Sequence, residues 1–512
     1  ATEAAHTYAE PGHYQVVVTV SDGAREERTT FSHTVHRALP EAPPTTSSTI
    51  AYDARRGRGW AVNPHSDTVT ALAASGHPSV LFEVPVGRHP RTLAVAGDGS
   101  VWVACQDDDR VVVLDGERGT VRANLVLPRG SQPFAIAADP AGTTLYVTLF
   151  ATGEVAAIDA RTREVRWRAA VGPKPRGLAV TPDGRRLFVS RFVSPAERGE
   201  VRSVRAADGT VEEPIALAAD TTTVDAEDRG RGVPNYVGAP VISSDAAELW
   251  VPSKQDNVFR GLARDGRPLE HDKTTRAVTS RVELASGHEV TGGRIDFNDR
   301  AMPSAVAFTP LGDYAFVAMQ GSSTVEIRDA YTGAAVGAVD KVGKAPQGLV
   351  LSPDGSRLFV QGFMSRTVTV HDTAGVLAGG ELAPPRVASL ATVAAERLAP
   401  EVLRGKQLFY EARDPRISRD GYISCAGCHA DGDDDGRVWD FTDRGEGFRN
   451  TTMLRGRAGM GHGPVHWSAN FDEIQDFEND IRNAFGGAGL MSDADFHAGT
   501  RAQSLGDPKA GV

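Results

Sequence analysis

Cys425 and Cys428, followed directly by His429, form the clearest chemical motif of the sequence, Cys-X-X-Cys-His. This spacing is typical of c-type haem attachment, in which two thiols bond to the porphyrin and the adjacent histidine ligates the iron. The alternative is a zinc ion held by the two cysteines and two histidines. The third cysteine, Cys105, lies in the apolar run VWVAC and is expected to be a buried free thiol.

The segment before the motif favours haem over zinc. In residues 393–412, apolar side chains such as Leu398 and Phe409 recur at helical spacing, and Pro400 suits a first helical turn. A helix that precedes the motif by about twenty residues is found in c-type cytochromes. The sequence therefore predicts one haem c in this chain, with His429 as the proximal iron ligand.

The stretches SCAGCHADGDDDGRVWDF, GFRNTTMLRG and HWSANFDEIQDFE resemble the haem domains of the bacterial di-haem cytochrome c peroxidase and MauG superfamily. In that family an Arg-Asn/Thr-Pro segment and a short aromatic or histidine segment follow the haem motif. Arg449-Asn450-Thr451 and His466-Trp467 stand at those places, although Thr-Thr replaces Thr-Pro. The resemblance covers about 395–490 and implies a small α-helical cytochrome c-like domain over 393–512. The family carries two haems, so a second haem domain either follows the given C-terminus or is lacking.

The resemblance also bears on the sixth iron ligand, since the family's distal ligand lies just before or within the segment aligned with HWSA. His466 is the preferred ligand, and His462, Met460 and an open or water-bound iron are the alternatives. A histidine ligand gives a low potential suited to electron transfer, a methionine raises the potential, and an open site permits peroxide chemistry. The other side chains of suitable type in this segment are Met453, Met491 and His497.

Four further side chains are candidates for the haem site. Trp439 and Trp467 either pack against the macrocycle edge or relay an electron to a second centre. Arg449 could bind a haem propionate through a bidentate fork, or it is solvated surface charge. Glu473 could serve as proton donor to peroxide, and the alternative is the acidic start of a helix.

Asp431, Asp433 and Asp435, followed by Gly436, match the first half of a calcium loop. Three close carboxylates repel one another unless a cation lies among them. The closing position is Thr442 rather than glutamate, so calcium is weighed here against a solvated acidic loop.

Most of the chain before residue 393 consists of short β-branched runs separated by glycine and proline, and these runs repeat. A glycine followed three residues later by a proline precedes strand–turn–strand units such as RGLAVTPDGRRLFVS and QGLVLSPDGSRLFVQ. Four strands per unit of about 43 residues is the arithmetic of a propeller blade. Seven starts fall near residues 57, 92, 135, 177, 239, 304 and 348.

The repeat resembles the YVTN family of bacterial seven-bladed propellers over 45–392. Residues 1–38, with TYAEPGHYQVVVTVSDG, resemble the closing strands of a PKD domain, an immunoglobulin-like sandwich. The expected fold is thus mainly β: a partial PKD-like segment, a seven-bladed β-propeller and the haem domain. Since so few residues cannot bury a sandwich core, the hairpin was either cut from a longer domain or packs on the propeller.

The formal net charge of −11 argues against a nucleic-acid binder, and no apolar run is long enough to span a membrane. We expect a periplasmic, extracellular or cell-surface protein, as haem c and PKD resemblance both imply, with a redox partner protein. Two functions remain open: redox chemistry by electron transfer or peroxide reduction, with the propeller as docking scaffold, or a non-enzymatic electron-transfer or binding protein whose propeller recognises an external partner.

Overall fold

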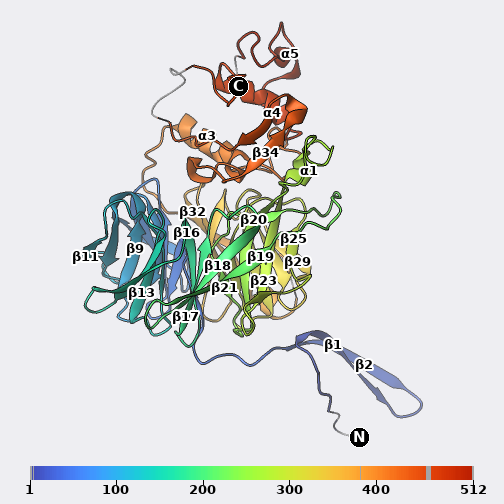
Figure 1. Cartoon of the computed structure of the whole chain (residues 1–512). Helices are drawn as coiled ribbons and strands as arrows, with labels where there is room; N and C mark the ends of the chain where they lie inside the picture. Colours follow the sequence, from blue (N-terminus) through green and yellow to red (C-terminus); the bar gives the residue numbers. More distant parts are fainter. Residues whose placement is uncertain (1–2, 4, 381, 457–462, 510–512) are drawn as a thin grey trace.

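The computed structural model of the protein describes residues 3, 5–380, 382–456 and 463–509. Seven antiparallel sheets are arranged around a common axis as the blades of a propeller (Figure 1). The segment that follows the last blade lies over one end of this axis, and the N-terminal hairpin lies at the opposite end. The predicted seven-bladed propeller is therefore confirmed.

The first four blades are regular four-stranded sheets. From the innermost strand outward, the first blade contains β4 (Ile50–Asp53), β5 (Arg58–Asn63), β6 (Thr68–Ala73) and β7 (Ser79–Pro85), and the second contains β8 (Pro90–Val95), β9 (Val101–Cys105), β10 (Arg110–Leu114) and β11 (Val121–Val126). The third blade contains β12 (Pro133–Ala138), β13 (Thr144–Leu149), β14 (Glu154–Asp159) and β15 (Val165–Ala170). The fourth contains β16 (Pro175–Val180), β17 (Arg186–Arg191), β18 (Arg198–Arg205) and β19 (Val211–Ala218).

The fifth blade is irregular and carries the long insertions, whereas the last two blades are regular. The fifth blade contains β20 (Val233–Asn235), β21 (Val241–Ile242), β22 (Glu248–Asp256), β23 (Thr275–Glu283), β24 (His288–Glu289) and β25 (Ile295–Phe297). The sixth contains β26 (Pro303–Phe308), β27 (Tyr314–Met319), β28 (Thr324–Asp329) and β29 (Ala335–Val339). The seventh contains β30 (Pro346–Leu351), β31 (Arg357–Gly362), β32 (Thr367–Asp372) and β33 (Arg386–Ala391). Two short helices, α1 (His271–Thr274) and α2 (Ala374–Leu377), lie in connections.

The repeated proline begins the innermost strand of five blades. The residue before it has a positive φ in each case, a conformation that is rare for non-glycine residues, so the chain turns sharply into each inner strand. These pairs are His89–Pro90, Gln132–Pro133, Lys174–Pro175, Met302–Pro303 and Ala345–Pro346. The first blade lacks the motif, and its inner strand begins at Ile50 rather than near 57.

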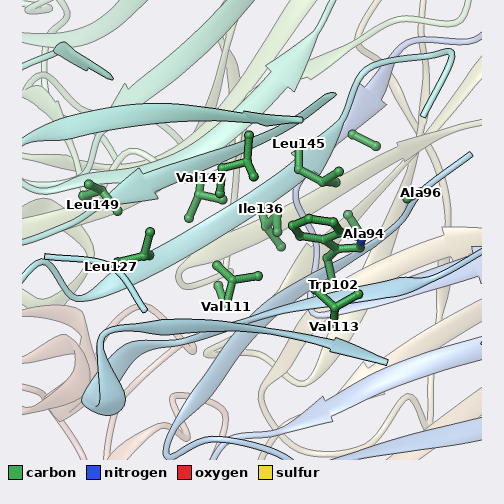
Figure 2. Packing of buried hydrophobic residues seen from close by; sticks show 13 residues of the cluster. Ala94, Ala96, Trp102, Val111, Val113, Leu127, Ile136, Leu145, Val147 and Leu149 are labelled. Atoms are coloured by element: carbon green, nitrogen blue, oxygen red, sulfur yellow. The ribbon is translucent and has the colours of Figure 1, made fainter. Parts of the chain in front are cut away.

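The core lies between neighbouring blades, because alternate side chains of each strand face the next sheet. Figure 2 shows one such cluster, in which Trp102, Val111, Ile136 and Val147 from the second and third blades pack together, each fully buried. Burial of one such side chain contributes about 1.5–3 kcal/mol. Cys105, at the end of β9, is buried and unpaired, as predicted.

The chain enters the propeller through its axis. The short strand β3 (Thr45–Thr46) pairs with the inner strand β16, and Ser48 forms a bridge to Leu93. Residues 46–49 thus cross one end of the axial channel. They are followed directly by β4, which starts the first blade.

The N-terminal residues form a two-stranded hairpin, β1 (Gly12–Ser21) and β2 (Glu26–Val35), that projects from the propeller (Figure 1). The His13 ring stacks on Tyr314 with 4.3 Å between the ring centroids. Farther along the hairpin, Val17, Val20 and Phe31 are each at least half exposed. The part of the hairpin that packs on the propeller is therefore small.

The segment after the propeller is less helical than expected. Its elements are α3 (Pro400–Phe409), β34 (Val438–Phe441), β35 (Gly447–Asn450), α4 (Phe477–Asn483) and α5 (Asp493–Phe496). The helix predicted before the motif is present and has Pro400 in its first turn. The other described residues form loops and 3-10 turns, whose buried contacts are largely with the propeller. No helix in the described part of the chain is long and apolar enough to cross a membrane.

Candidate functional site

The Cys-X-X-Cys-His motif forms a single tight turn. Residues Cys425–Gly427 make one 3-10 turn, and the backbone N–H of His429 donates a 3.0 Å hydrogen bond to the carbonyl oxygen of Cys425. Both thiols are unpaired and partly accessible. Burial raises the pKa of Cys425 to about 11 and that of Cys428 further. Both sulfurs are therefore thiols at neutral pH, and they lie on one turn with the imidazole.

His429 has the form that an iron ligand requires. Its pKa is lowered, mainly by burial, so the imidazole is neutral at pH 7. Its Nδ1 atom is buried and makes no hydrogen bond within the described residues. The nearby backbone of Asp433 and Thr452 acts to raise the pKa of the ring, against the effect of burial. Two unpaired thiols and one neutral imidazole on a single turn are the donor set that haem c needs, so the residues fit the group.

The propeller holds this turn from below through Tyr236. The Tyr236 hydroxyl donates a 2.6 Å hydrogen bond to the carbonyl oxygen of Cys428 and accepts one of 3.2 Å from the N–H of Ala430. Burial raises the pKa of Tyr236 well above its ordinary value, so the hydroxyl keeps its proton. The Tyr236 ring stacks on Phe192 with 4.5 Å between centroids.

A buried ion cluster continues the contact. Lys254, on the long strand β22, lies 2.9 Å from Asp256 and 3.0 Å from Asp435 of the motif segment. Arg437 pairs with Asp256 at 3.0 Å, and the indole N–H of Trp439 donates to Asp435 at 3.3 Å. All five side chains are more than nine-tenths buried. Trp439 therefore packs on this cluster, directly beneath the motif.

The three aspartates of the acidic run do not converge. Asp431 pairs with Arg176 at 3.0 Å and with Arg91 at 3.3 Å. Asp433 pairs instead with Arg455, and Asp435 with Lys254. Within the described residues, no group of three or more histidine, cysteine, aspartate or glutamate side chains could hold a metal ion. The acidic run, for which calcium was weighed against a solvated loop, thus forms separate ion pairs in the described structure.

Arg449 and Trp467 lie next to each other at the surface. Arg449 donates to the Ser468 hydroxyl at 2.9 Å, and its Nε atom is buried without a partner in the described structure. The Trp467 indole donates to the carbonyl oxygen of Asn450 at 2.8 Å, yet 64 % of the residue is exposed. An unpaired guanidinium N–H suits a propionate, whereas Trp467 is placed as a surface side chain.

His466 is packed among aromatic rings. It has a positive φ, its ring centroid lies 4.1 Å from that of Phe471, and its Nδ1 is 3.1 Å from Oδ1 of Asn470. The His466 ring acts to lower the pKa of Asp480, and the Asp480 carboxylate acts to raise that of Cys425, which places all three in one electrostatic neighbourhood. No hydrogen bond or ion pair among the described residues joins His466 to the motif turn. The alternatives His462 and Met460 lie outside the described residues.

Glu473 caps a turn. Its carboxylate and Asp476 form reciprocal capping hydrogen bonds, and it accepts a 2.5 Å hydrogen bond from the N–H of Lys509. This is the acidic start of a helix, weighed above against a proton donor. The remaining candidates are spread: Met453 is 58 % exposed, Met491 is buried, and His497 is exposed.

Sequence reasoning missed the propeller residues that hold the motif. The repeat did contain a signal for the two arginines: the residue after the repeated proline lines the axial channel in five blades, namely Arg91, Phe134, Arg176, Ser304 and Gln347. A lysine and an aspartate inside the apolar strand β22 were a second signal. Tyr236 lies in an insertion without repeat pattern, so nothing in the sequence pointed to it.

Residues 46–292 match the family model described as outer membrane protein assembly factor BamB. Together with the seven sheets, this match supports a seven-bladed β-propeller with BamB-like repeats. Hydrazine synthase of Kuenenia stuttgartiensis is similar in structure, with a TM-score of 0.54 and 21 % identity over 66 % of this chain and 97 % of that chain. An inactive virginiamycin B lyase of Staphylococcus aureus, solved with quinupristin, gives a TM-score of 0.42 and 13 % identity over 68 % of this chain and 95 % of that chain. Comparison with curated protein sequences finds no match.

Proposed function

We propose that the protein is an extracytoplasmic c-type cytochrome that transfers electrons, with one haem attached to Cys425 and Cys428 and His429 as proximal ligand. The observation that carries the proposal is the motif turn itself: two unpaired thiols and a neutral imidazole, held on the axial face of the propeller. Such a haem would supply a one-electron Fe(III)/Fe(II) couple. The distal side is proposed to be closed by His466.

The chain's own residues would orient and shield the group. Tyr236 fixes the backbone between the second cysteine and the acidic run, and Trp439 offers an apolar, buried ring beside it. Arg449, with its buried Nε lacking a partner in the described structure, is the proposed propionate ligand. We favour electron transfer over peroxide reduction because Glu473 is engaged in a cap and Trp467 faces solvent.

The propeller is proposed to be the support of the haem segment. The insertion 220–238 and strand β23 contact the C-terminal segment: the Tyr422 hydroxyl donates to the carbonyl oxygen of Glu227 at 3.1 Å and lies 3.2 Å from Arg276. The alternative, a propeller that recognises a surface or extracellular partner, would have to use the blade edges or the exposed hairpin.

Several further parts of the proposal rest on resemblance. These are the membership of residues 393–512 in the di-haem peroxidase and MauG superfamily, a redox partner protein, a second haem domain and the PKD-like nature of residues 1–38. A periplasmic or extracellular location follows from the proposed haem c, since that cofactor is attached outside the bacterial cytoplasm.

The test is covalent haem attachment in a bacterial host that matures c-type cytochromes. We expect one haem per chain in the pyridine haemochrome spectrum, and haem that stays with the polypeptide after denaturation. Cys425→Ser/Cys428→Ser should lose it, whereas Cys105→Ala, which removes the buried thiol of β9, should retain it. A wild-type chain that folds and binds zinc instead of haem would overturn the proposal.

The ferric absorption spectrum then separates electron transfer from peroxide reduction. A low-spin spectrum that peroxide leaves unchanged agrees with a filled sixth position and electron transfer. His466→Ala should convert it to a high-spin form, whereas His497→Ala, at an exposed position, should not. A wild-type high-spin iron that peroxide converts to a ferryl species would replace electron transfer by peroxide reduction.

A further inference from the structure

A partly enclosed cavity of about 110 Å³ lies on the propeller axis, beneath the motif segment. The entering residues Thr46–Thr49 line it, and Tyr410, Ala430 and Asp431 contribute from the C-terminal segment. Its other walls come from inner strands of the blades and the residues beside them. Since one water needs only about 10–15 Å³ of such a volume, the cavity has room for a ligand larger than a single water molecule.

The side chains that line the cavity include more cations than carboxylates. Three cations line it, Arg91, Arg176 and Lys254, with a single carboxylate, Asp431. The charge of Lys254 is compensated by its ion pairs with Asp256 and Asp435. The two arginines are left to share Asp431, and an uncompensated buried charge is costly.

Among the described residues, Asp431 is the one carboxylate that forms an ion pair with Arg176. Burial is the main cause of the lowered pKa of this arginine, which Asp431 acts to raise and Arg91 acts to lower. On the side of Arg91, the next carboxylate is Asp107, which is half exposed and faces His89. The described part of the chain thus leaves about one positive charge unmatched at the axis.

Arg176 also has donors to spare. Its guanidinium carries five N–H groups, and the one hydrogen bond it makes in the described structure runs from Nη2 to Asp431. The guanidinium carbon lies 4.5 Å from the ring centroid of Phe134 and 3.8 Å from that of Phe192. The group is therefore oriented before any ligand arrives.

We propose that the axial cavity is a binding site for one small monovalent anion, a halide or a carboxylate of one or two carbon atoms, held by Arg176 and Arg91 on the inner side of Asp431. The volume excludes large anions, and the charge excess of one favours a monoanion. The amide groups of Gln320 and Gln347 add neutral polar groups to the wall. The bound anion would tie the motif segment to the propeller through the arginines that hold Asp431.

The test uses bromide and formate with the full chain. In crystals grown in bromide, an anomalous peak is expected inside the cavity beside Arg176. In solution at constant ionic strength, replacing gluconate by formate should raise Tm saturably, by about 1–3 °C at high excess. A cavity without an anomalous peak, together with a Tm that formate does not change, would overturn the proposal.

Two variants shift the affinity in opposite directions. Arg176→Met should abolish the formate effect, whereas Arg185→Met, on a hairpin where that side chain is 84 % exposed, should retain it. Asp431→Asn removes the competing carboxylate and should tighten formate binding about tenfold. Asp434→Asn, in the same loop and paired with Lys174 near the surface, is its control and should leave the affinity unchanged. Equal formate effects in all four variants would contradict the assignment, and Asp431→Asn remains decisive if Arg176→Met does not fold.

Discussion

The hydroxyl oxygen of Tyr236 lies 2.6 Å from the carbonyl oxygen of Cys428, although 192 residues separate them in the sequence. The bond joins the irregular fifth blade to the centre of the Cys-X-X-Cys-His turn. The same hydroxyl accepts from Ala430, so both sides of His429 in the backbone are held by one propeller side chain. The geometry of the motif is therefore set by the propeller as well as by its local sequence.

Replacing Tyr236 by phenylalanine should weaken this junction. The substitution leaves the Cys428 carbonyl and the Ala430 N–H without their partner in a buried place, which costs about 1–3 kcal/mol. The free energy of unfolding in urea should fall by that amount. Tyr14→Phe is the matched control, because the Tyr14 hydroxyl also donates to a backbone carbonyl, at 2.7 Å, but at an exposed position. A loss no larger than that of the control would show that the junction contributes little.

Lys254→Met should be more destabilising. The substitution leaves Asp256 and Asp435 buried with one cation fewer, and breaking a buried pair in this way costs about 3–5 kcal/mol. The double variant Lys254→Met/Asp435→Asn should lose less than the sum of the two single losses, since the charges are coupled. Lys344→Met removes a half-exposed lysine 3.7 Å from Glu411 and should change the free energy of unfolding by less than about 1 kcal/mol.

The propeller could be predicted from the sequence because most blades repeat the same pattern of a proline followed by a strand, a turn and a second strand. The proline that begins β8, β12 and β16 reappears at a nearly constant spacing, so the copies reinforce one another. The irregular fifth blade departs from this pattern, so its strand bounds could not be predicted. The first blade was placed seven residues late because Ile50 follows an entering segment without the proline motif.

The site was predictable only in its Cys-X-X-Cys-His motif. Cys425, Cys428 and His429 are close in sequence, so their spacing alone carries the chemistry. The surrounding charges could not be assigned, because spacing suggested that the carboxylates of Asp431 and Asp435 converge. Their partners, Arg176 and Lys254, come from two different blades and are brought to the axis only by closure of the propeller.

Calcium should not stabilise the protein. Asp431, Asp433 and Asp435 pair with different basic side chains, so a divalent cation would have to displace four ion pairs to collect their oxygens. We expect the same Tm in millimolar calcium and in excess chelator. Calcium-binding calorimetry on the wild type and on Asp433→Asn gives a second measurement. A calcium-dependent rise in Tm that Asp433→Asn removes would restore the calcium loop.

The contact of α3 with the propeller should weaken in acid through His65. Its Nδ1 lies 3.0 Å from Nη2 of Arg366, and its Nε2 lies 3.1 Å from Nζ of Lys406 on α3. Burial, with these two cations, lowers the pKa of His65 to about 3. The unfolded chain takes up this proton near pH 6.5, so between about pH 6.5 and pH 3 the unfolded state binds more protons. The free energy of unfolding must then fall as the pH falls through this window.

His65→Gln removes this proton linkage. Between pH 7 and pH 5 the wild type should lose about 2 kcal/mol more unfolding free energy than the variant, since one site contributes at most about 1.4 kcal/mol per pH unit below pH 6.5. Urea unfolding at a series of pH values measures the difference, and His288→Gln, at an exposed position, is the control. Parallel curves for the wild type and His65→Gln would mean that His65 is protonated in the folded protein, with Lys406 or Arg366 turned away from the ring.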